Sequence, residues 1–358
     1  MPEKKRLLYF VEAMGGGVFT YIVDLANELV EKYDMYIAYA VRPQTPSDYE
    51  KYFDKRIHLI RVKNFERSIS LFKDIKALVE IKKIAKSVSP DIIHLHSSKA
   101  GVLGRVAFNG KKIKLFYTPH GYSFLMQNQS ETKRKVYKTI EKLCCKSGSI
   151  TISCSKGEHE ETLKLTNKAL YVNNGINIDS LQHLIDNTKA NRNTTFTVFT
   201  LGRICYQKNP DLFNEIAYKM PGIRFIWIGD GELKNRLTAP NIEITGWCER
   251  TDALRIALSA DAFVLTSLWE GLPISLLEAM YMKKYCLVSN VIGNKDVIHD
   301  GINGFICNSA IDYVDRIKLL QSEEQNGLLE KAYSDVTDYY STKTMANQYD
   351  LIYSEEIK

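Results

Sequence analysis

Short apolar runs alternate with amphipathic helical stretches along almost the whole chain. This alternation is typical of β-α-β units, in which helices cover both faces of a parallel sheet and the buried strands are almost continuously apolar. The pattern therefore predicts an α/β protein with a parallel sheet in each half of the chain. Strands are predicted at residues 7–11, 35–40, 57–61, 92–96, 115–119, 149–154 and 169–172, then at 196–201, 224–228, 242–245, 262–265, 286–289 and 304–307. Helices are predicted at 20–32, 69–87, 101–110 and 131–145.

The length of the chain and one polar segment indicate where the two halves meet. The 358 residues exceed what one hydrophobic core of ordinary size holds, so two domains are expected. Residues 186–195 are polar and turn-rich and are the best candidate for a linker. We therefore predict a first domain at residues 1–185 and a second at 186–341.

Composition limits the class of protein and its compartment. No segment approaches the roughly 18 uninterrupted apolar residues that a membrane-spanning helix requires. The first residues, Met-Pro-Glu-Lys-Lys-Arg, lead directly into a predicted strand instead of a long apolar signal region. The seven cysteines are odd in number and form no C-x-x-C pair, which suits a reducing compartment. These features predict a cytoplasmic protein without a cysteine metal site.

The formal charge of +6 is mild but unevenly distributed. No basic stripe is interleaved with aromatic residues, so nucleic acid is not an expected partner. Residues 133–146 combine lysines with apolar side chains at helical spacing, and Lys111, Lys112 and Lys114 add a second basic patch. This segment has two interpretations: a peripheral contact with an anionic membrane surface, or a helix with one buried stripe and a solvated basic face.

Two carboxylates, Glu270 and Glu278, flank the turn Gly271-Leu272-Pro273 between an apolar strand and an apolar helix. Gly271 allows the backbone to pass close to a ligand, and Pro273 suits the first helical position. The unpaired N–H groups and the dipole at the helix start favour a phosphate, and each carboxylate can accept hydrogen bonds from two adjacent sugar hydroxyls. The alternative places Glu278 on the wet face of an otherwise buried helix and makes Glu270 an ordinary loop carboxylate.

Two further loops have residue types that suit a nucleotide diphosphate. Arg203 offers a planar fork of donors and Lys208 a compact charge, although two cations in a loop are also common on ordinary surfaces. Gly15, Gly16 and Gly17 remove side chains where a ligand could approach a helix start. The G-x-G-x-x-G spacing is absent, and a flexible turn is the alternative for these glycines.

Histidines and one tryptophan complete the candidate residues. His120 ends a predicted strand and could donate to a sugar hydroxyl or a phosphate, or be a structural histidine. His94 and His96 share one face of a strand, but no third ligand nearby suggests a metal. Trp247 follows Gly246 and could stack on a planar ring of a ligand, or be partly buried without a ligand.

These motifs together resemble the retaining GT-B glycosyltransferases of glycosyltransferase family 4, over essentially the whole chain. Glu270 and Glu278 match the E-x7-E signature of that family, and His120-Gly121 matches its His-Gly element. Its G-R-x-x-x-x-K-G element is matched from Gly202 to Lys208, with Asn209 where glycine is usual. Weaker matches are Asn174-Gly175-Ile176-Asn177, the turn from Ile228 to Glu232, and Gly293 with Asp296.

The resemblance implies a fold and a set of residue roles. The fold is α/β, with two Rossmann-like doubly wound domains facing a central cleft and the last helix, within 342–358, packing back on the first domain. The first domain is expected to bind the acceptor and the second the nucleotide sugar. Catalytic roles are implied for His120, Arg203, Lys208 and Glu270. Donor nucleotide or phosphate binding is implied for Gly16, Gly17, Gly246, Trp247, Gly271, Leu272 and Glu278, and the acceptor side for His96, Ser97 and Lys99.

The implied reaction moves a hexose or N-acetylhexosamine from a UDP-sugar to a sugar hydroxyl with retention of configuration. The segments around His96 and His120 particularly resemble bacterial capsule and exopolysaccharide enzymes that extend undecaprenyl-diphosphate-linked sugars, at the inner face of the membrane. Lys99 or Arg105 is expected to touch the lipid diphosphate. No D-x-D pair stands at a strand end, so neither a metal nor another cofactor is expected.

Three alternatives to this reaction remain. One is an inactive nucleotide-sugar-binding subunit, and another is a sugar-nucleotide epimerase of related fold. The third, a double-displacement glycosidase, is disfavoured because a helix-embedded Glu278 is better placed to bind ribose than to attack a sugar.

Overall fold

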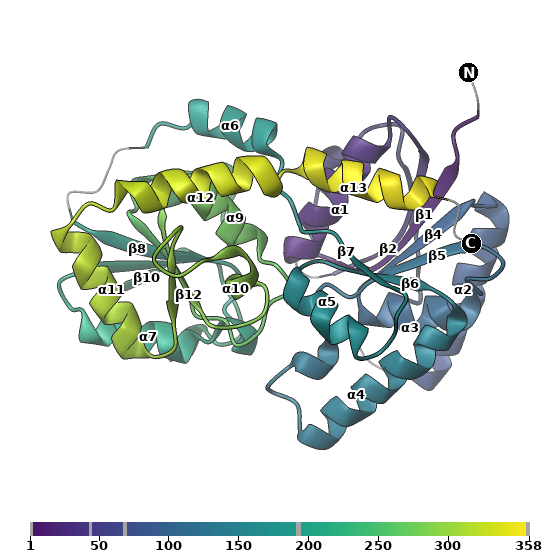
Figure 1. The fold of residues 1–358 in the computed structure, drawn as a ribbon, viewed down its shortest axis with the longest axis horizontal. Helices are drawn as coiled ribbons and strands as arrows, with labels where there is room; N and C mark the ends of the chain where they lie inside the picture. Colours follow the sequence, from purple (N-terminus) through teal and green to yellow (C-terminus); the bar gives the residue numbers. More distant parts are fainter. Residues whose placement is uncertain (1–2, 43–44, 67–69, 191–194, 356–358) are drawn as a thin grey trace. The chain divides into compact units, whose positions relative to one another are not determined.

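Parallel strands covered by helices form two separate units in the computed structural model (Figure 1), which describes residues 3–42, 45–66, 70–190 and 195–355. The first unit comprises Met1–Leu125, Gln129–Asn174 and Thr342–Lys358. The second comprises Met126–Asn128 and Gly175–Ser341. We refer to them as unit 1 and unit 2.

Unit 1 contains a seven-stranded parallel sheet in the order β3-β2-β1-β4-β5-β6-β7. The strand order reverses between β1 and β4. Doubly wound folds bind ligands at this switch point, just beyond the carboxyl ends of the strands. The strands are β1 (Arg6–Met14), β2 (Asp34–Val41), β3 (His58–Arg61), β4 (Ile92–His96), β5 (Lys114–Thr118), β6 (Ile150–Ser153) and β7 (Ala169–Tyr171). The helices are α1 (Gly16–Leu29), α2 (Leu71–Val88), α3 (Ser98–Ala107), α4 (Glu131–Cys144), α5 (Lys156–Leu163) and α13 (Thr342–Ser354).

Alternate residues of each strand in unit 1 enter two different cores, because successive side chains point to opposite faces of a sheet. Leu7, Tyr9 and Val11 pack against α1 and α13 on one face. Leu8 and Phe10 pack against α2 and α3 on the other. Figure 1 shows α1 and the yellow α13 on one side of this sheet and α2, α3 and α4 on the other. The carboxyl ends of the strands are left to the loops.

Unit 2 contains a six-stranded parallel sheet in the order β10-β9-β8-β11-β12-β13, which reverses between β8 and β11. The strands are β8 (Thr197–Leu201), β9 (Arg224–Ile228), β10 (Ile242–Ile244), β11 (Ala262–Leu265), β12 (Tyr285–Ser289) and β13 (Phe305–Cys307). The helices are α6 (Ile178–Asp186), α7 (Pro210–Lys219), α8 (Arg250–Ser259), α9 (Ile274–Tyr281), α10 (Asn294–Val297), α11 (Ala310–Ser322) and α12 (Asn326–Tyr339).

The sequence predicted every strand of both sheets with bounds close to those observed. The boundary between the units differs from the predicted one: it falls between Asn174 and Gly175 instead of at residue 185. Helix α6 groups with unit 2, where Tyr281 donates a hydrogen bond of 2.7 Å to Gln182. Of the predicted linker, residues 191–194 lie outside the described residues. Helix α13 belongs to unit 1 and is anchored there by Lys32 and Tyr33, which both contact Asp350.

Candidate functional site

In unit 2 the loops that follow β8 and β11 meet at the switch point of the sheet. Lys208 Nζ donates to Glu270 Oε1 at 2.7 Å, and the two side chains are only 17% and 8% exposed. The backbones of the loops are joined as well: Thr266 Oγ1 donates to the carbonyl of Lys208 at 2.7 Å, and the N–H of Leu268 to the carbonyl of Gln207 at 2.8 Å. A cation and a carboxylate are thus held together at the carboxyl edge, where the sequence motifs placed both.

Asn209, the departure from the family pattern, adopts the backbone conformation that glycine would otherwise supply. Its φ is +50°, and its side chain accepts a hydrogen bond from the N–H of Leu212 as the N-cap of α7. Asparagine is one of the few residue types that populate left-handed angles, and it is also a good N-cap. The substitution therefore keeps the geometry of the loop that carries Lys208.

Arg203 lies in the same loop but nearer to β9. Its guanidinium is 3.9 Å from the carboxylate of Glu232, and both side chains are solvent-accessible. The loops after β8 and β9 pack backbone against backbone. A Cβ on Gly231 would lie only 2.1 Å from the carbonyl oxygen of Ile204, so no side chain fits between them. Arg203 is therefore carried on a closely packed loop with its charged end accessible.

Glu278 is buried on α9 and has an ionic partner that the sequence motifs did not reveal. Arg250 Nη2, at the start of α8, donates to Glu278 Oε1 at 2.5 Å. Every residue of α9 except Ser275 is buried, so the interpretation of Glu278 as part of a wet helix face is wrong. Pro273 stands at the N-cap of α9, one position before the predicted one.

The turn that carries Glu270, Gly271 and Leu272 is supported from a third loop. Gly293 has φ +85°, and a Cβ there would lie 2.4 Å from the carbonyl oxygen of Gly271 and 3.1 Å from Cβ of Glu270. Asp296 accepts a hydrogen bond from the N–H of Gly293 at 3.0 Å. The matched pair Gly293 and Asp296 therefore acts on the shape of the Glu270 turn.

Gly246 and Trp247 form an open, exposed corner of unit 2 beyond β10. Gly246 has φ +72°, with nothing within 4 Å of where a Cβ would be. Trp247 is 63% exposed, so the alternative of a partly buried tryptophan does not describe it. An indole in water is suited to stacking on a planar base.

In unit 1 the glycine turn lies at the start of α1. The helix begins at Gly16, with Gly15 as its N-cap, four residues before the predicted start at residue 20. Gly16 has φ +57°, and at both Gly16 and Gly17 nothing lies within 4 Å of the position that a Cβ would occupy. The N–H groups of this helix start are therefore accessible to a ligand.

His120 follows β5 and is half-buried with φ +55°, an uncommon conformation for a residue other than glycine. Its Nε2 shares a hydrogen bond of 3.1 Å with Nδ1 of His96. Burial lowers the pKa of His120 to about 3 and the pKa values of His94 and His96 well below their ordinary range. The three imidazoles are therefore neutral at physiological pH, and His120 and His96 share one proton between the two facing nitrogens.

The residues predicted for the acceptor side have different environments. His96 is fully buried and reaches a ligand only through His120. Ser97, with φ +74°, is the N-cap of α3, and Lys99 pairs with Asp74 at 2.7 Å. Arg105 is buried, so the prediction that it touches a lipid diphosphate is wrong.

The reason is that Arg105 has strong partners inside unit 1. Its guanidinium bonds to Glu141 at 2.6 Å and stacks on the ring of Tyr117, 3.9 Å from the centroid. This group ties α3 to α4 beneath the surface.

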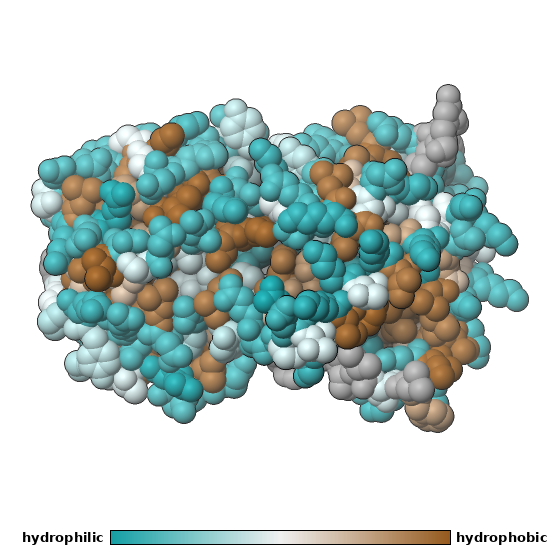
Figure 2. Space-filling view, turned by 60° about the horizontal axis from the view of Figure 1, so that its bottom comes forward, coloured by the Kyte–Doolittle hydropathy of each residue, from teal (hydrophilic) through white to brown (hydrophobic). Residues whose placement is uncertain are grey.

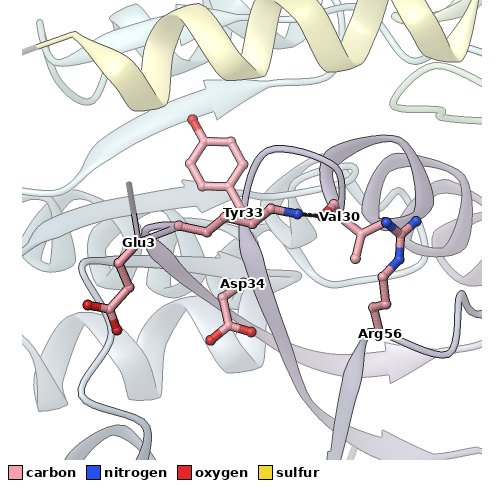
Figure 3. A pocket seen from close by; sticks show the side chains of 6 residues that line it. Glu3, Val30, Tyr33, Asp34 and Arg56 are labelled. Carbon is pink, nitrogen blue, oxygen red and sulfur yellow. Dashed lines mark hydrogen bonds between the residues drawn. The ribbon is translucent and has the colours of Figure 1, made fainter. Parts of the chain in front are cut away.

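A cavity of about 250 Å³ lies away from these loops, at the amino ends of β1 and β2 (Figure 3). Its lining residues are Glu3, Lys4, Val30, Tyr33, Asp34 and Arg56. Because it is at the opposite end of the strands from the switch point, it does not contribute to the site.

Neither a metal-binding cluster nor a membrane-spanning helix is found in the described parts of the chain. Among these residues, no group of three His, Cys, Asp or Glu side chains is arranged to hold a metal ion. None of the helices in residues 3–42, 45–66, 70–190 and 195–355 has the length and apolar character needed to cross a bilayer.

Comparison with known proteins gives two family matches that together cover most of the chain. Residues 15–180 match the model described as Glycosyltransferase Family 4, and residues 182–335 match Glycosyl transferases group 1. The boundary between the two matches is close to the boundary between units 1 and 2.

Two relatives and one solved structure are informative. The Escherichia coli UDP-Gal:alpha-D-GlcNAc-diphosphoundecaprenol alpha-1,3-galactosyltransferase is 33% identical over 289 residues, which cover 71% of this chain and 72% of that protein. The Campylobacter jejuni N,N'-diacetylbacillosaminyl-diphospho-undecaprenol alpha-1,3-N-acetylgalactosaminyltransferase is 22% identical over 98% of each chain. The structure of Anabaena HepE with UDP and glucose superposes with a TM-score of 0.77 at 16% identity, covering 98% of this chain and 99% of that one.

Proposed function

Since the chain belongs to glycosyltransferase family 4 and has the GT-B fold, we propose that it moves a hexose or N-acetylhexosamine from a UDP-sugar to a sugar on undecaprenyl diphosphate. The configuration at the anomeric carbon is retained, and the product is a lengthened glycan for a cell-surface polysaccharide. The observation that carries this proposal is the pair of the half-buried Lys208 and the buried Glu270, held at the switch point of unit 2 beside the start of α9.

The donor's diphosphate suits the cations and N–H groups at this edge. As the bond to the anomeric carbon breaks, negative charge develops on the leaving phosphate. Lys208, Arg203 and the first N–H groups of α9 are already in place to stabilise that charge, so little reorganisation is needed during the reaction. Glu270 orients Lys208 through Oε1, and its Oε2, which accepts a long hydrogen bond of 3.4 Å from Gln207, has a second lone pair for a hydroxyl of the donor sugar.

The nucleoside suits the residues around Glu278. The Glu278 carboxylate can accept hydrogen bonds from both hydroxyls of a ribose, while Arg250 donates a hydrogen bond to Oε1 of the same carboxylate. The exposed indole of Trp247 offers a face for uracil. In unit 1 the open glycines of α1 and the neutral imidazole of His120 are available to phosphate and sugar hydroxyls.

The relatives support the acceptor class and leave the donor sugar open. The Escherichia coli relative is named for UDP-galactose and an acceptor on diphosphoundecaprenol, and the Campylobacter jejuni relative for an N-acetylgalactosamine transfer to a diphospho-undecaprenol acceptor. Both names contain a polyprenyl diphosphate, which supports the same acceptor class here. The two transferred sugars differ only in the 2-acetamido group, so a few contacts decide between them.

The lipid-linked acceptor makes an anionic membrane surface a proposed partner of unit 1. The outer surface of α2, α3 and α4 exposes six apolar side chains, each at least 48% exposed: Phe72, Ile75, Val79, Val106, Val136 and Leu143. Exposed lysines accompany them on α2 and α4: Lys73, Lys76, Lys82, Lys133, Lys135 and Lys138. Figure 2 shows hydrophobic residues gathered at the lower right of the right-hand unit. Apolar side chains beside lysines suit insertion between anionic head groups.

A release assay tests the reaction. The purified protein is incubated with UDP-glucose, UDP-galactose and their N-acetyl forms, with and without an undecaprenyl-diphosphate-linked sugar, in the presence and absence of EDTA. We expect UDP release with one donor, only when the acceptor is present, and unaffected by EDTA. UDP binding without release for every pair would support the inactive subunit, and acceptor-independent conversion of the donor would support the epimerase.

A vesicle assay tests the membrane surface. The variant Val136→Ser/Leu143→Ser should bind vesicles containing phosphatidylglycerol about tenfold or more weakly, since each exposed aliphatic side chain contributes roughly 1.5–3 kcal/mol when buried. Ile311→Ser on α11 of unit 2, where Ile311 is 61% exposed, is the matched control and should bind like the wild type. Equal binding by all three proteins would overturn the membrane surface and leave the transfer reaction untouched.

A further inference from the structure

Helix α13 places two tyrosines in the interior of unit 1, below the loop that carries His120. Tyr349 and Tyr353 are fully buried, one turn apart, in the core on the α1 side of the sheet. Phenylalanine would fill this space without the need to satisfy a hydroxyl, and a buried hydroxyl without a partner is costly. The hydrogen bonds made by these two hydroxyls therefore need an explanation.

Tyr353 reaches the end of β5 through His94. The Tyr353 hydroxyl is 2.5 Å from Nδ1 of His94 and 3.2 Å from the hydroxyl of Tyr9. On the other side of its ring, His94 Nε2 bonds to Oγ1 of Thr118 at 2.9 Å. Thr118 is the last residue of β5, two positions before His120. Tyr353 and His94 thus hold the strand end from which the His120 loop departs.

Tyr349 reaches His120 through α1. The hydroxyl of Tyr21 donates to the hydroxyl of Tyr349 at 2.7 Å, and the Tyr349 hydroxyl lies 3.5 Å from Oγ1 of Thr118. The ring of Tyr21 packs edge-on against the imidazole of His120, with 4.6 Å between the centroids. A tyrosine held at its hydroxyl cannot swing away from the imidazole that its ring edge contacts.

His120 needs such support because its backbone and side chain are both constrained. Its φ of +55° is unfavourable for a residue with a Cβ, and such conformations persist only where the surroundings impose them. Glu158 accepts the N–H of Gly121 at 2.7 Å, which fixes the backbone after His120. His96 bonds to Nε2 of the imidazole and packs against the ring of His94. Among the described residues, none is hydrogen-bonded to Nδ1, so this nitrogen is the one left to meet a ligand.

We propose that Tyr349 and Tyr353 are positioning residues for His120: their hydroxyls, acting through Tyr21, His94 and Thr118, fix the orientation of its imidazole. The C-terminal helix is therefore part of the machinery of the site and not only a structural closure of unit 1. The kinetic part of this proposal rests on the proposed transferase activity. The structural part, the state of the His120 ring, does not.

The test compares Tyr349→Phe and Tyr353→Phe with a matched control, Tyr33→Phe. Tyr33 also ties α13 to unit 1, since its hydroxyl donates to Asp350 at 2.9 Å, but that hydroxyl ends at the partly exposed carboxylate of Asp350 and bonds to no member of the network that reaches His120 among the described residues. In Figure 3 the ring of Tyr33 points toward the yellow helix. All three changes remove one hydroxyl that docks α13, and only the first two act on the network that reaches His120.

Nitrogen-15 NMR of protein labelled at histidine measures the resonances of the His120 ring nitrogens, which report their protonation and hydrogen bonding. These resonances are assigned by their loss in His120→Gln. We expect Tyr349→Phe and Tyr353→Phe to shift the His120 ring nitrogens and to lower kcat between about tenfold and about 100-fold, with KM for the donor changed less than about threefold. Tyr33→Phe should leave both the spectrum and kcat unchanged. Tyr21→Phe removes the hydrogen bond between Tyr21 and Tyr349 from the Tyr21 side. This variant tests the positioning role of that bond if Tyr349→Phe does not fold.

Unchanged His120 resonances in the tyrosine variants would overturn the proposal, and so would an equal shift in Tyr33→Phe, because docking of α13 alone would then explain it. A wild type without transferase activity toward any donor would overturn the proposed function. The NMR comparison still decides the positioning role in that case, so the two failures are distinguishable.

Discussion

Lys208 and Glu270 form the contact on which the proposed reaction most depends. Removing a preorganised cation from a developing phosphate charge typically lowers kcat about 10²–10³-fold. We expect losses of this size for Lys208→Ala and for Arg203→Ala, measured as initial rates of acceptor-dependent UDP release.

The control for these two variants is Arg236→Ala, which removes an exposed arginine of unit 2 that pairs with Asp211 at 3.8 Å. It should keep the wild-type rate. Equal rates for Lys208→Ala and Arg236→Ala would show that the Lys208 cation does not act on the leaving group.

Gly293 offers a second prediction at the scale of one residue. Gly293→Ala forces a Cβ to within 2.4 Å of the Gly271 carbonyl at φ +85°. We expect unit 2 to lose about 1–3 kcal/mol of unfolding free energy, from strain of this kind, and kcat/KM to fall as the Glu270 turn shifts. Urea unfolding followed by tryptophan fluorescence measures the first quantity.

The comparison is Gly327→Ala on α12, where nothing lies within 4 Å of the added Cβ. This variant should gain roughly 0.4–1 kcal/mol, because alanine is the better helix former. If Gly293→Ala changed neither the unfolding free energy nor kcat/KM, the loop after β12 would have moved to accommodate the Cβ, and it would not support the Glu270 turn.

At this scale the sequence identified side chains better than it identified their partners. Glu270 and Lys208 were predicted separately, but neither their ion pair nor the pair of Glu278 with Arg250 could be read from spacing. Arg250 is 28 residues from Glu278 in the chain, and only the fold brings them together. A charged residue at the first position of a helix beside the Trp247 loop was the available signal.

At the scale of helices and strands, the buried pair of Arg105 and Glu141 joins α3 to α4. Removing one partner of a buried ion pair typically costs about 3–5 kcal/mol. We expect Arg105→Met to destabilise unit 1 by that amount, and the double variant with Glu141→Gln to recover part of it, since glutamine keeps an acceptor for Tyr117. Hydrogen exchange of α3 and α4 peptides measures the change.

The matched control is Arg56→Met, which breaks an exposed pair with Glu31 and Asp54. Exposed pairs contribute roughly 0–1 kcal/mol, so exchange should change little. If Arg105→Met behaved in the same way, the pair would not be what holds α4 against α3.

Strands were easier to predict than helices because a buried parallel strand is a continuous apolar run. Helix α5 was missed because it has no apolar stripe, and its sequence, Lys-Gly-Glu-His-Glu-Glu-Thr-Leu, reads as a loop. Its signal was Ser155 followed three residues later by Glu158, since the serine caps the helix. Helix α6 was missed for another reason: the polar segment that follows it drew the predicted boundary past it.

At the scale of the whole molecule, each unit has its own core, and the three tryptophans, Trp227, Trp247 and Trp269, all belong to unit 2. Tryptophan fluorescence therefore follows unit 2 alone, while exchange of β4 and β5 amides follows unit 1. The sequence predicted two parallel-sheet units because two series of apolar runs were visible. The return of the last helix to the first unit was implied by the family resemblance and not by the pattern of apolar runs, since it depends on contacts across the whole chain.

Buried histidines make the stability of unit 1 depend on pH. His94 and His96 have pKa values well below the ordinary value of about 6.5 because burial disfavours their charged forms. Above that pH, folded and unfolded chains are both neutral at these sites. Below it, the unfolded chain takes up protons that the folded chain does not, so the free energy of unfolding falls by up to about 1.4 kcal/mol per histidine and pH unit.

We therefore expect amides of β4 and β5 to exchange faster at pH 5.5 than at pH 7.5, after correction for the intrinsic rate. Burial raises the pKa of the Glu158 carboxyl, so this group stabilises the folded chain as the pH falls. It is a single group, and it opposes the loss of stability caused by the buried histidines. His94→Gln should reduce the dependence. A stability of unit 1 that does not change between these pH values would contradict the neutral, buried state of the histidines.

Mass spectrometry and proton NMR of the acceptor after incubation with each UDP-sugar test the transfer most directly. We expect the undecaprenyl-diphosphate-linked sugar to gain one residue, joined in the α configuration, with the wild type and with Arg236→Ala and not with Lys208→Ala. An acceptor that stays unchanged with all four donors, although the protein binds UDP, would contradict the proposed transfer.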